Sequence, residues 1–287
     1  MSQQNSRGEL MVVATPLGNL GDLSRRALEL FAAADAIYCE DTRHSRTLFS
    51  AHEIPSGGRL HALHEHNEAS QCADICERIT RGELVVLISD AGTPGISDPG
   101  TRVVAAVAEA GLRVSTAPGP SAVIAALSIS GLPTERFCME GFVPRKTGER
   151  AALYERWSRE ERTIVFYESP QRITTTLREL AAVFPQRRVA VARELTKIHE
   201  EVIRGTVSEV AETVASRDVM GEIVVVLDGA TVTHEVDEDA VRRALLDQLA
   251  HGASVRDAVT EVVAALGVNH RDTYQLALVL RTESAGN

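Results

Sequence analysis

The sequence is poor in aromatic residues and contains no long hydrophobic run. Aromatic side chains make up 4% of the 287 residues, whereas hydrophobic residues as a whole make up 44%. The cores must therefore be built mainly from Ala, Val, Leu and Ile. No apolar segment reaches membrane-spanning length, and the first ten residues lack the apolar core of a signal peptide. These absences predict a soluble, cytoplasmic protein with no membrane association.

Cysteine is also scarce, and the four cysteines show no CxxC spacing. We therefore expect reduced thiols with structural roles. Three histidines in the segment HALHEH lack a Cys or Asp partner at ligand spacing, so no metal site is predicted. The signatures GxSxG, HExxH, GxxxxGK[ST] and GxGxxG are absent as well. The four cysteines are Cys39, Cys72, Cys76 and Cys138, and the three histidines are His61, His64 and His66.

The net charge of −10 argues against indiscriminate binding to nucleic acid. The charges are unevenly distributed, however. Residues 140–200 carry 12 basic and 9 acidic side chains, a net charge of +3 within an acidic chain. Of these basic residues only Lys146 and Lys197 are lysines. The segment is either a solvated surface or a contact for a polyanion.

The most informative stretch is LVVLISDAGTPGISDPG, residues 84–100. Its first half is a continuous apolar run, which predicts a buried strand. Its second half consists of small residues, two prolines and two aspartates, which predicts a rigid loop with little side-chain bulk. Such loops let backbone groups approach a ligand closely. Either this is a ligand-binding loop or it is an ordinary strand-to-helix junction.

Residues 10–131 alternate between strand and helix patterns about four times, which predicts a parallel sheet with helices on its faces. Three loops of this region follow strands, and each is rich in Gly, Pro, Ser and Thr: residues 15–22, 89–99 and 117–121. They should gather at one edge of the sheet and hold a flat, polar ligand, uncharged to zwitterionic, largely through the backbone. Asp90 could accept from a ribose hydroxyl or an ammonium group. The expected strands are 10–14, 36–39, 59–63, 84–88 and 113–116, and the expected helices are 25–35, about 42–50, 69–81, 101–110 and 122–130.

Gly, Pro and charged residues break this pattern at residues 141–150, where we place a domain boundary. A second α/β set follows, and the apolar, β-branched run at 223–227 should be its central strand. After residue 230 the chain becomes polar and then predicts three short helices. These could form a helix-turn-helix unit or a packing or dimerisation subdomain. The predicted division is a disordered tail (1–8), a first α/β lobe (9–142), a second α/β lobe (143–230) and a helical subdomain (237–287).

One polar cluster, Glu40-Asp41-Thr42-Arg43, comes directly after the predicted strand 36–39. Glu40 and Asp41 could act as a proton-transfer pair, or they could simply be a charged strand end.

The motifs taken in order resemble a known family. They are TPLGNLGD, CEDTR, HEHNE, SDAGTPGISDPG, PGPSA, VPRK, FYESPQR, RELTKIHEE and GEIVVVLDG. The chain resembles the tetrapyrrole-methylase-like superfamily, and more closely its bacterial branch that methylates ribose 2′-hydroxyls of small-subunit ribosomal RNA. Cobalamin-pathway members carry a GxGxGD-like first turn, and this chain departs from that pattern at Leu17, Asn19 and Leu20.

The resemblance implies a two-lobed α/β enzyme that binds S-adenosylmethionine in the cleft between the lobes. It implies methyl transfer to a cytidine ribose in the decoding region of 16S ribosomal RNA in the 30S particle, and a homodimer. The contacts to the methyl donor that it implies are Leu17, Leu20, Asp90, Ala91, Thr93, Ile96, Ser121, Ala122, Tyr167, Ala192, Gly221, Glu222 and Ile223.

A ribose hydroxyl needs positioning and a base to become a nucleophile. We nominate Glu40 and Asp41 for proton transfer, with Arg43 to hold a phosphate or orient a carboxylate. Glu168 is a second candidate base. Arg145 and Lys146 are candidates for RNA contact.

Two alternatives stay open at this point. One is a methyltransferase of the same superfamily that acts on a tetrapyrrole or a protein. The other is a non-catalytic RNA-binding or assembly factor, which the overall acidity disfavours.

Overall fold

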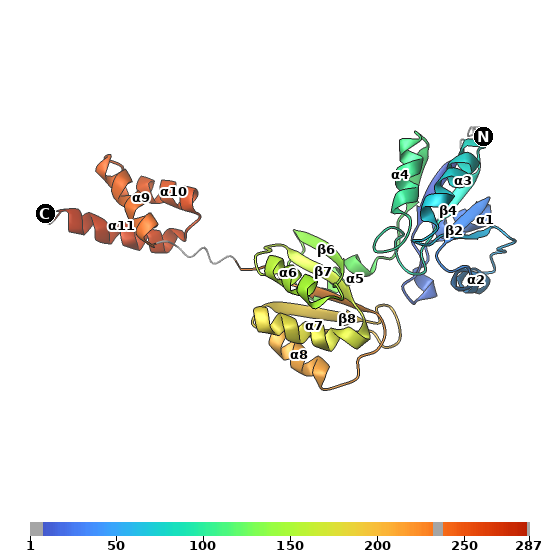
Figure 1. The fold of residues 1–287 in the computed structure, drawn as a ribbon. Coiled ribbons are helices and arrows are strands. Elements are labelled where there is room, and N and C mark those ends of the chain that lie inside the picture. The colour runs from blue at the N-terminus through green and yellow to red at the C-terminus, as the bar shows by residue number, and fades with distance from the viewer. Residues whose placement is uncertain (1–7, 232–237, 286–287) are drawn as a thin grey trace. The chain divides into compact units, whose positions relative to one another are not determined.

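The computed structural model describes residues 8–231 and 238–285, so the predicted tail lies almost entirely outside the described residues. The chain divides into two compact units, residues 1–230 and 231–287 (Figure 1). Among the described residues no helix is long and apolar enough to cross a membrane.

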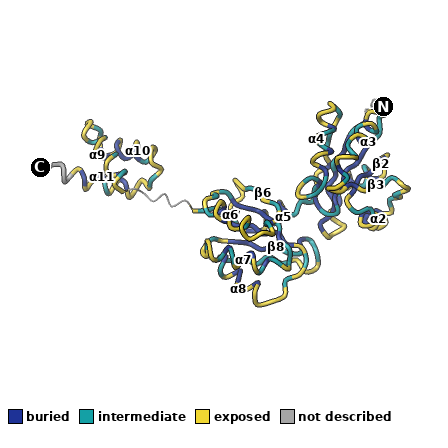
Figure 2. Tube along the Cα trace, in the orientation of Figure 1, coloured by how far each residue is buried: buried dark blue, intermediate teal, exposed yellow. Residues whose placement is uncertain are grey.

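The first unit begins with a five-stranded sheet of order β3-β2-β4-β1-β5, in which every pairing is parallel. The predicted parallel sheet is confirmed. Helices α1 and α2 contribute to one core cluster and α3 and α4 to another, so both faces of the sheet are covered. Most residues of the inner strands β1, β2 and β4 are buried, and dark blue segments run through this part of the tube in Figure 2. The elements are β1 (Glu9–Val13), η1 (Leu20–Asp22), α1 (Arg25–Ala33), β2 (Ala36–Cys39), α2 (Thr42–Ala51), β3 (Leu60–Ala62), α3 (Glu68–Thr80), β4 (Leu84–Leu87), α4 (Thr101–Glu109), β5 (Arg113–Ala117) and α5 (Ala122–Ser130).

The second sheet has the order β6-β7-β10-β8-β9. β10 is its central strand, as predicted, and all five of its residues are buried. It runs antiparallel to both neighbours, and because β6 pairs with β7 in parallel, this sheet is mixed whereas the first is parallel. The elements are β6 (Phe137–Phe142), α6 (Thr147–Trp157), β7 (Thr163–Glu168), α7 (Pro170–Val183), β8 (Arg188–Arg193), β9 (Glu201–Thr206), α8 (Val207–Ala215) and β10 (Ile223–Leu227).

β6 is a strand that the sequence did not predict. It is an edge strand of the second sheet, so that sheet begins before residue 143, where the second lobe was expected to start. The strand was missed for a physical reason: it alternates between exposed and half-buried residues and has an irregular register between Met139 and Phe142. Gly141, at φ +69°, lies within that irregular part.

Helix α5 joins the two lobes. It ends the first α/β series, but its residues Val123, Ala126 and Leu127 belong to a core cluster with side chains of the second sheet. Only part of this apolar helix, AVIAALSIS, is covered, because Ile124 and Ile129 are 54% and 38% exposed. From the second sheet, the guanidinium of Arg204 donates to the carbonyl of Ser130 at the end of α5, at 3.0 Å.

The second unit contains three helices with their own core, α9 (Glu238–Ala250), α10 (Val255–Leu266) and α11 (His270–Ala285). Ser254 is the N-cap of α10, because its hydroxyl accepts from the backbone N–H of Asp257. Gly267 ends α10 in the left-handed conformation, which glycine adopts at low cost.

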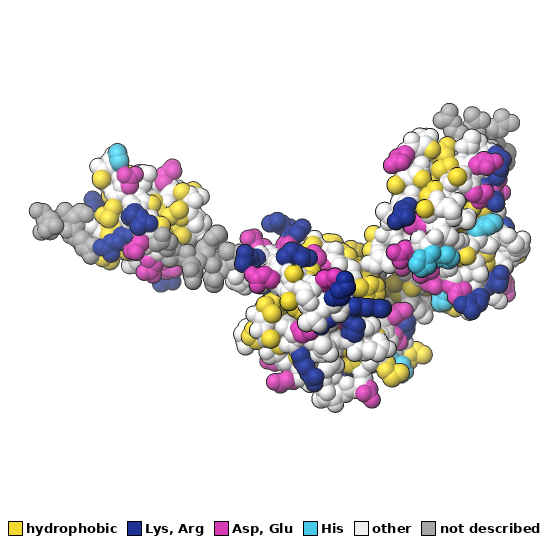
Figure 3. All heavy atoms as spheres, viewed as in Figure 1, with side chains coloured by type: hydrophobic (Ala, Val, Ile, Leu, Met, Phe, Trp, Pro, Cys, Tyr) yellow, Lys and Arg dark blue, Asp and Glu magenta, His cyan; other side chains and the backbone are white. Residues whose placement is uncertain are grey.

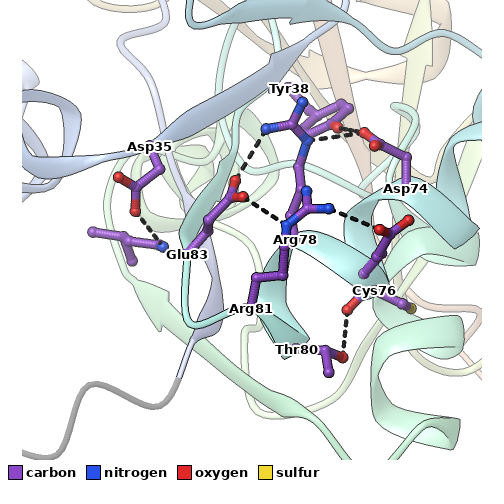
Figure 4. A network of polar contacts seen from close by, with 10 residues as sticks. Asp35, Tyr38, Asp74, Cys76, Arg78, Thr80, Arg81 and Glu83 are labelled. Carbon is purple, nitrogen blue, oxygen red and sulfur yellow. Dashed lines mark hydrogen bonds and ion pairs between the residues drawn. The ribbon is translucent and has the colours of Figure 1, made fainter.

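A charged network fastens α3 to the first sheet (Figure 4). Arg78 bonds the carboxylates of Asp74 and Glu83, and Asp74 also accepts from the hydroxyl of Tyr38 on β2. The pKa of Tyr38 is raised by burial and by the neighbouring carboxylate. These charges are paired with one another, so the network has a structural role.

Glu68, at the start of α3, holds the start of a different helix. Its side-chain oxygen Oε1 accepts from the backbone N–H groups of Gly100 and Arg102, at 2.9 and 2.8 Å. Both lie at the N-terminus of α4, whose dipole favours a negative charge. Glu68 is only 6% exposed. The last residue of the motif HEHNE therefore fixes the end of the loop that precedes α4.

Substituting Glu68 tests this cap. Glu68→Ala should lower the free energy of unfolding by about 2 kcal/mol, because buried N–H groups lose their acceptor. Glu77→Ala is the matched control, since Glu77 lies on the same helix in an exposed ion pair with Arg81. It should change stability by less than about 0.5 kcal/mol. Equal losses for the two variants in urea unfolding would contradict the assignment.

Candidate functional site

The three predicted loops meet at the carboxyl edge of the first sheet. Thr15 and Gly92 exchange two backbone hydrogen bonds, at 2.9 and 3.1 Å. The Thr15 hydroxyl donates to the carbonyl of Ser89 at 3.0 Å, and the Thr93 hydroxyl donates to the carbonyl of Pro120 at 3.0 Å. The expectation that these loops form one surface is therefore confirmed.

A cavity of about 400 Å³ lies between these loops and the second lobe. Its walls come from the first-lobe loops, from β7 with the residues that follow it, and from the start of β10. The lining residues are Leu17, Asp90, Ala91, Gly92, Thr93, Ile96, Ser97, Asp98, Ser121, Ala122, Phe142, Tyr167, Glu168, Ser169, Pro170, Gly221, Glu222, Ile223 and Val224.

Most of the residues expected to contact a methyl donor line this cavity. Two do not. Leu20 lies in η1 and is 46% exposed, so it faces solvent. Ala192 is 1% exposed and buried in the contact between α5 and the second sheet. The predicted residues that do line the cavity are Leu17, Asp90, Ala91, Thr93, Ile96, Ser121, Ala122, Tyr167, Gly221, Glu222 and Ile223.

Asp98 is a cavity residue that the sequence reasoning missed. Its pKa is raised to about 6, first by burial and then by the negative charges of Glu40 and Asp90. Asp98 belongs to the same loop as Asp90. The sequence offered one signal for it, namely that this loop contains a second aspartate. Within Asp-Pro-Gly it suggested only a turn.

Glu40 does not line the cavity, but its carboxyl group belongs to the same acidic group of side chains. Its pKa is raised by burial and by the charges of Asp90 and Asp41, and His64 partly offsets this. Glu40, Asp90 and Asp98 together make this region strongly negative. A cation is therefore a better occupant than an anion.

Asp41 and Arg43 are engaged with each other outside the cavity. The carboxylate of Asp41 caps α2 by accepting from the Arg43 backbone at 2.8 Å, and it accepts from the guanidinium at 2.8 Å. These bonds lower the pKa of Asp41 to about 2, which makes it a weak base. The backbone N–H of Asp41 donates to Asp90 at 3.0 Å, so this strand end helps to position Asp90.

Glu168 borders the cavity, but its carboxylate is turned into the protein. Its side chain is 0% exposed and forms an ion pair with Arg172 at 2.9 Å. It also accepts from the Thr176 hydroxyl at 2.7 Å and from the backbone N–H of Ser169 at 2.8 Å. With both oxygens occupied, this carboxylate secures the start of α7 and is poorly placed to take a proton from a substrate.

Two aromatic rings form part of the opposite wall. The centroids of Phe142 and Tyr167 are 5.2 Å apart, and the rings are tilted at 43°. The pKa of Tyr167 is raised by burial and by the charge of Asp98. The cavity thus combines carboxylates on one side with a flat apolar surface on the other.

Arg145 and Lys146 lie outside the cavity, on the exposed segment after β6. The ammonium of Lys146 pairs with Glu149 at 2.9 Å and its side chain is 81% exposed. Lys and Arg side chains are frequent on the visible face of the second lobe (Figure 3). Within residues 8–231 and 238–285 no three His, Cys, Asp or Glu side chains gather as metal ligands, and all four cysteines are unbridged.

Comparison with known proteins places the chain in a family. The family described as Tetrapyrrole (Corrin/Porphyrin) Methylases matches residues 9–211. The chain is 44% identical over 283 residues to ribosomal RNA small subunit methyltransferase I of Mycobacterium tuberculosis, a match that covers 98% of both chains.

Two solved structures share the fold. One is the methyltransferase CobJ, with a TM-score of 0.58 and 22% identity, covering 78% of this chain and 95% of that chain. The other is uroporphyrin-III C-methyl transferase from Thermus thermophilus complexed with S-adenyl homocysteine, with a TM-score of 0.51 and 20% identity, covering 77% and 97%. The chain therefore belongs to the tetrapyrrole methylase family, and within it to the group of the ribosomal RNA small subunit methyltransferases I.

Proposed function

We propose that this chain transfers the methyl group of S-adenosylmethionine to the 2′-hydroxyl of a cytidine ribose in the decoding region of 16S ribosomal RNA. The observation that carries the proposal is the acidic cavity between the lobes, in a chain similar over nearly its whole length to a ribosomal RNA methyltransferase. The substrate is ribosomal RNA in the 30S particle. The working form is a homodimer, for which light scattering should give twice the chain mass of 31.0 kDa.

The cavity suits the methyl donor chemically. S-adenosylmethionine carries a sulfonium and an ammonium group, and Asp98 and Asp90 present negative charge to such groups. The apolar part of the lining, with Phe142 and Tyr167, offers a surface for a flat base. Predominantly apolar walls with a few placed polar groups are typical of cofactor sites.

Among the nominated acids, Glu40 is the best candidate for deprotonating the ribose hydroxyl. Its raised pKa makes it a stronger base than Asp41, whose pKa of about 2 reflects its bonds to Arg43. Glu168 is fully engaged in hydrogen bonds. In this proposal Asp41 and Arg43 shape the strand end, Glu40 accepts the proton, and in-line positioning of the hydroxyl supplies most of the acceleration.

The tetrapyrrole and protein substrates remain as alternatives, and one assay separates them from RNA. The chain is incubated with isotopically labelled S-adenosylmethionine and unmethylated 30S particles, and the RNA is digested to nucleosides. Mass spectrometry should find the label in 2′-O-methylcytidine. Label in a cytosine base, in a ribosomal protein or only in an added porphyrinoid would contradict the proposal, as would no transfer at all.

The acidity of the cavity should make donor binding depend on pH. Asp98, with a pKa of about 6, loses its proton between pH 5 and 7, and a cation binds the carboxylate form better. Affinity for S-adenosylmethionine should therefore rise with pH over that range. Asp98→Asn should lower affinity at pH 7.5 about tenfold and flatten the pH profile. Calorimetry on Glu109→Asn, a change on the exposed end of α4, should reproduce the wild-type profile.

Glu40→Gln should separate chemistry from binding. Loss of a general base lowers kcat by about 10²–10⁴-fold, while the affinity for S-adenosylmethionine should fall by less than about threefold. Glu29→Gln, in an exposed ion pair with Arg25, is the control and should keep full kcat. A Glu40→Gln enzyme with normal single-turnover kinetics would remove Glu40 from this role.

The RNA contacts of Arg145 and Lys146 are tested by salt dependence. If both side chains contact phosphates, the double variant Arg145→Ala, Lys146→Ala should reduce the slope of log K against log salt by about 1.5. The control removes two exposed arginines of the first lobe, Arg25→Ala with Arg113→Ala, which are 92% and 70% exposed. Similar slopes for the two double variants would contradict specific contact.

A further inference from the structure

Lys197, in the loop between β8 and β9, makes contacts that none of the roles above uses. The chain strongly prefers arginine, because its 30 Lys and Arg residues include only two lysines, Lys146 and Lys197. Lys146 lies on the surface with its side chain 81% exposed, whereas that of Lys197 is 28% exposed. Lys197 is therefore the less exposed of the two lysines, and both its ammonium and its methylene stem contact other parts of the chain.

The stem of Lys197 lies directly on the first lobe. A Cβ placed on Gly18 would be 2.4 Å from Cγ of Lys197 and 2.8 Å from its Cε. No side chain fits there unless the lysine moves. Gly18 directly follows Leu17, which lines the cavity. The lysine stem therefore packs against the turn that carries Leu17, a residue of the first-lobe wall of the cavity.

The ammonium of Lys197 holds the second-lobe wall. It donates to Glu194 at 2.9 Å and to Glu222 at 3.1 Å. Glu194 accepts in turn from the backbone N–H of Glu222 at 3.1 Å and lies so close to Gly221 that a Cβ there would be 2.2 Å from its carboxylate. Both Gly221 and Glu222 line the cavity.

The backbone of this loop is held in an unusual conformation. Glu194 and Thr196 have φ angles of +51° and +66°, which non-glycine residues rarely adopt. Such conformations persist where the surroundings impose them, and they cluster at functional sites. Hydrogen bonds from Lys197 lower the pKa of Glu194. The carboxylate therefore stays charged and can accept from both the Lys197 ammonium and the backbone N–H of Glu222.

We propose that Lys197 is a positioning residue that joins the two walls of the donor cavity: its stem fixes the Leu17–Gly18 turn and its ammonium fixes Gly221 and Glu222. The proposal rests on the proposed function, because it assumes that the methyl donor occupies this cavity. A lysine suits the position because a slender methylene chain fits against the glycine, while an arginine would bring a broad planar head. Without the ammonium, two carboxylates would be left beside an already acidic cavity.

A double-mutant cycle tests the clamp, with affinity for S-adenosylhomocysteine measured by calorimetry. Gly18→Ala and Lys197→Ala should each weaken binding about tenfold, and the double variant should be little worse than either one. Lys197→Met removes the charge but keeps the stem. Adding Gly18→Ala should therefore still weaken binding of S-adenosylhomocysteine in the Lys197→Met variant, but should hardly change it in the Lys197→Ala variant. Gly148→Ala is the control, because a Cβ at Gly148 would meet nothing within 4 Å.

Unchanged affinity in Gly18→Ala and Lys197→Ala, or losses that simply add, would overturn the clamp even if the melting temperature falls. If the wild type itself does not bind S-adenosylhomocysteine, the proposed function fails rather than the clamp.

The two lysines also allow a test without substitutions. Acetic anhydride labelling of the wild-type chain, read by mass spectrometry, should modify Lys146 faster than Lys197. S-adenosylhomocysteine should slow labelling of Lys197 further and leave Lys146 unchanged. Equal rates at Lys197 with and without S-adenosylhomocysteine would overturn the proposal.

Discussion

The loop between β4 and α4 is fixed at both ends by groups from other parts of the chain, and the site depends on that constraint. At one end Gly92 exchanges backbone hydrogen bonds with Thr15. At the other end the buried carboxylate of Glu68 binds the N–H groups of Gly100 and Arg102. Because the backbone is held in this way, Asp90 and Asp98 are kept at the cavity, where free side chains of like charge would move apart.

The acidic cavity has an energetic cost that a cationic ligand offsets. Asp98 has a raised pKa because burial and the charges of Glu40 and Asp90 disfavour its ionised form. A group with a perturbed pKa in a cavity is a mark of a functional site rather than of a stable core. Elsewhere in unit 1, buried carboxylates such as Glu68 and Glu168 are satisfied by several hydrogen bonds each. Asp98 differs from these structural acids, because burial and neighbouring like charges outweigh its hydrogen bonding and raise its pKa.

The sequence predicted the parallel sheet, the central strand β10 and the gathering of three loops, because each depends on local patterns of apolar and turn residues. It could not predict which groups a charged side chain contacts in the fold. Glu168 was nominated as a base, although Arg172 ends the same motif, because only the structure shows that Arg172 and Thr176 both bond its carboxylate. Asp98 was passed over because Asp-Pro-Gly also begins ordinary helices. Edge strand β6 was missed because it buries no continuous apolar face.

The central claim is that the methyl donor lies between the β4–α4 loop and the start of β10. Hydrogen exchange of the full chain with and without S-adenosylmethionine, resolved by peptide mass spectrometry, tests it most directly. The account predicts slower exchange in peptides that cover residues 90–98, 121–123 and 221–224, with little change in residues 238–285. Protection confined to other segments, at donor concentrations that saturate binding, would contradict it.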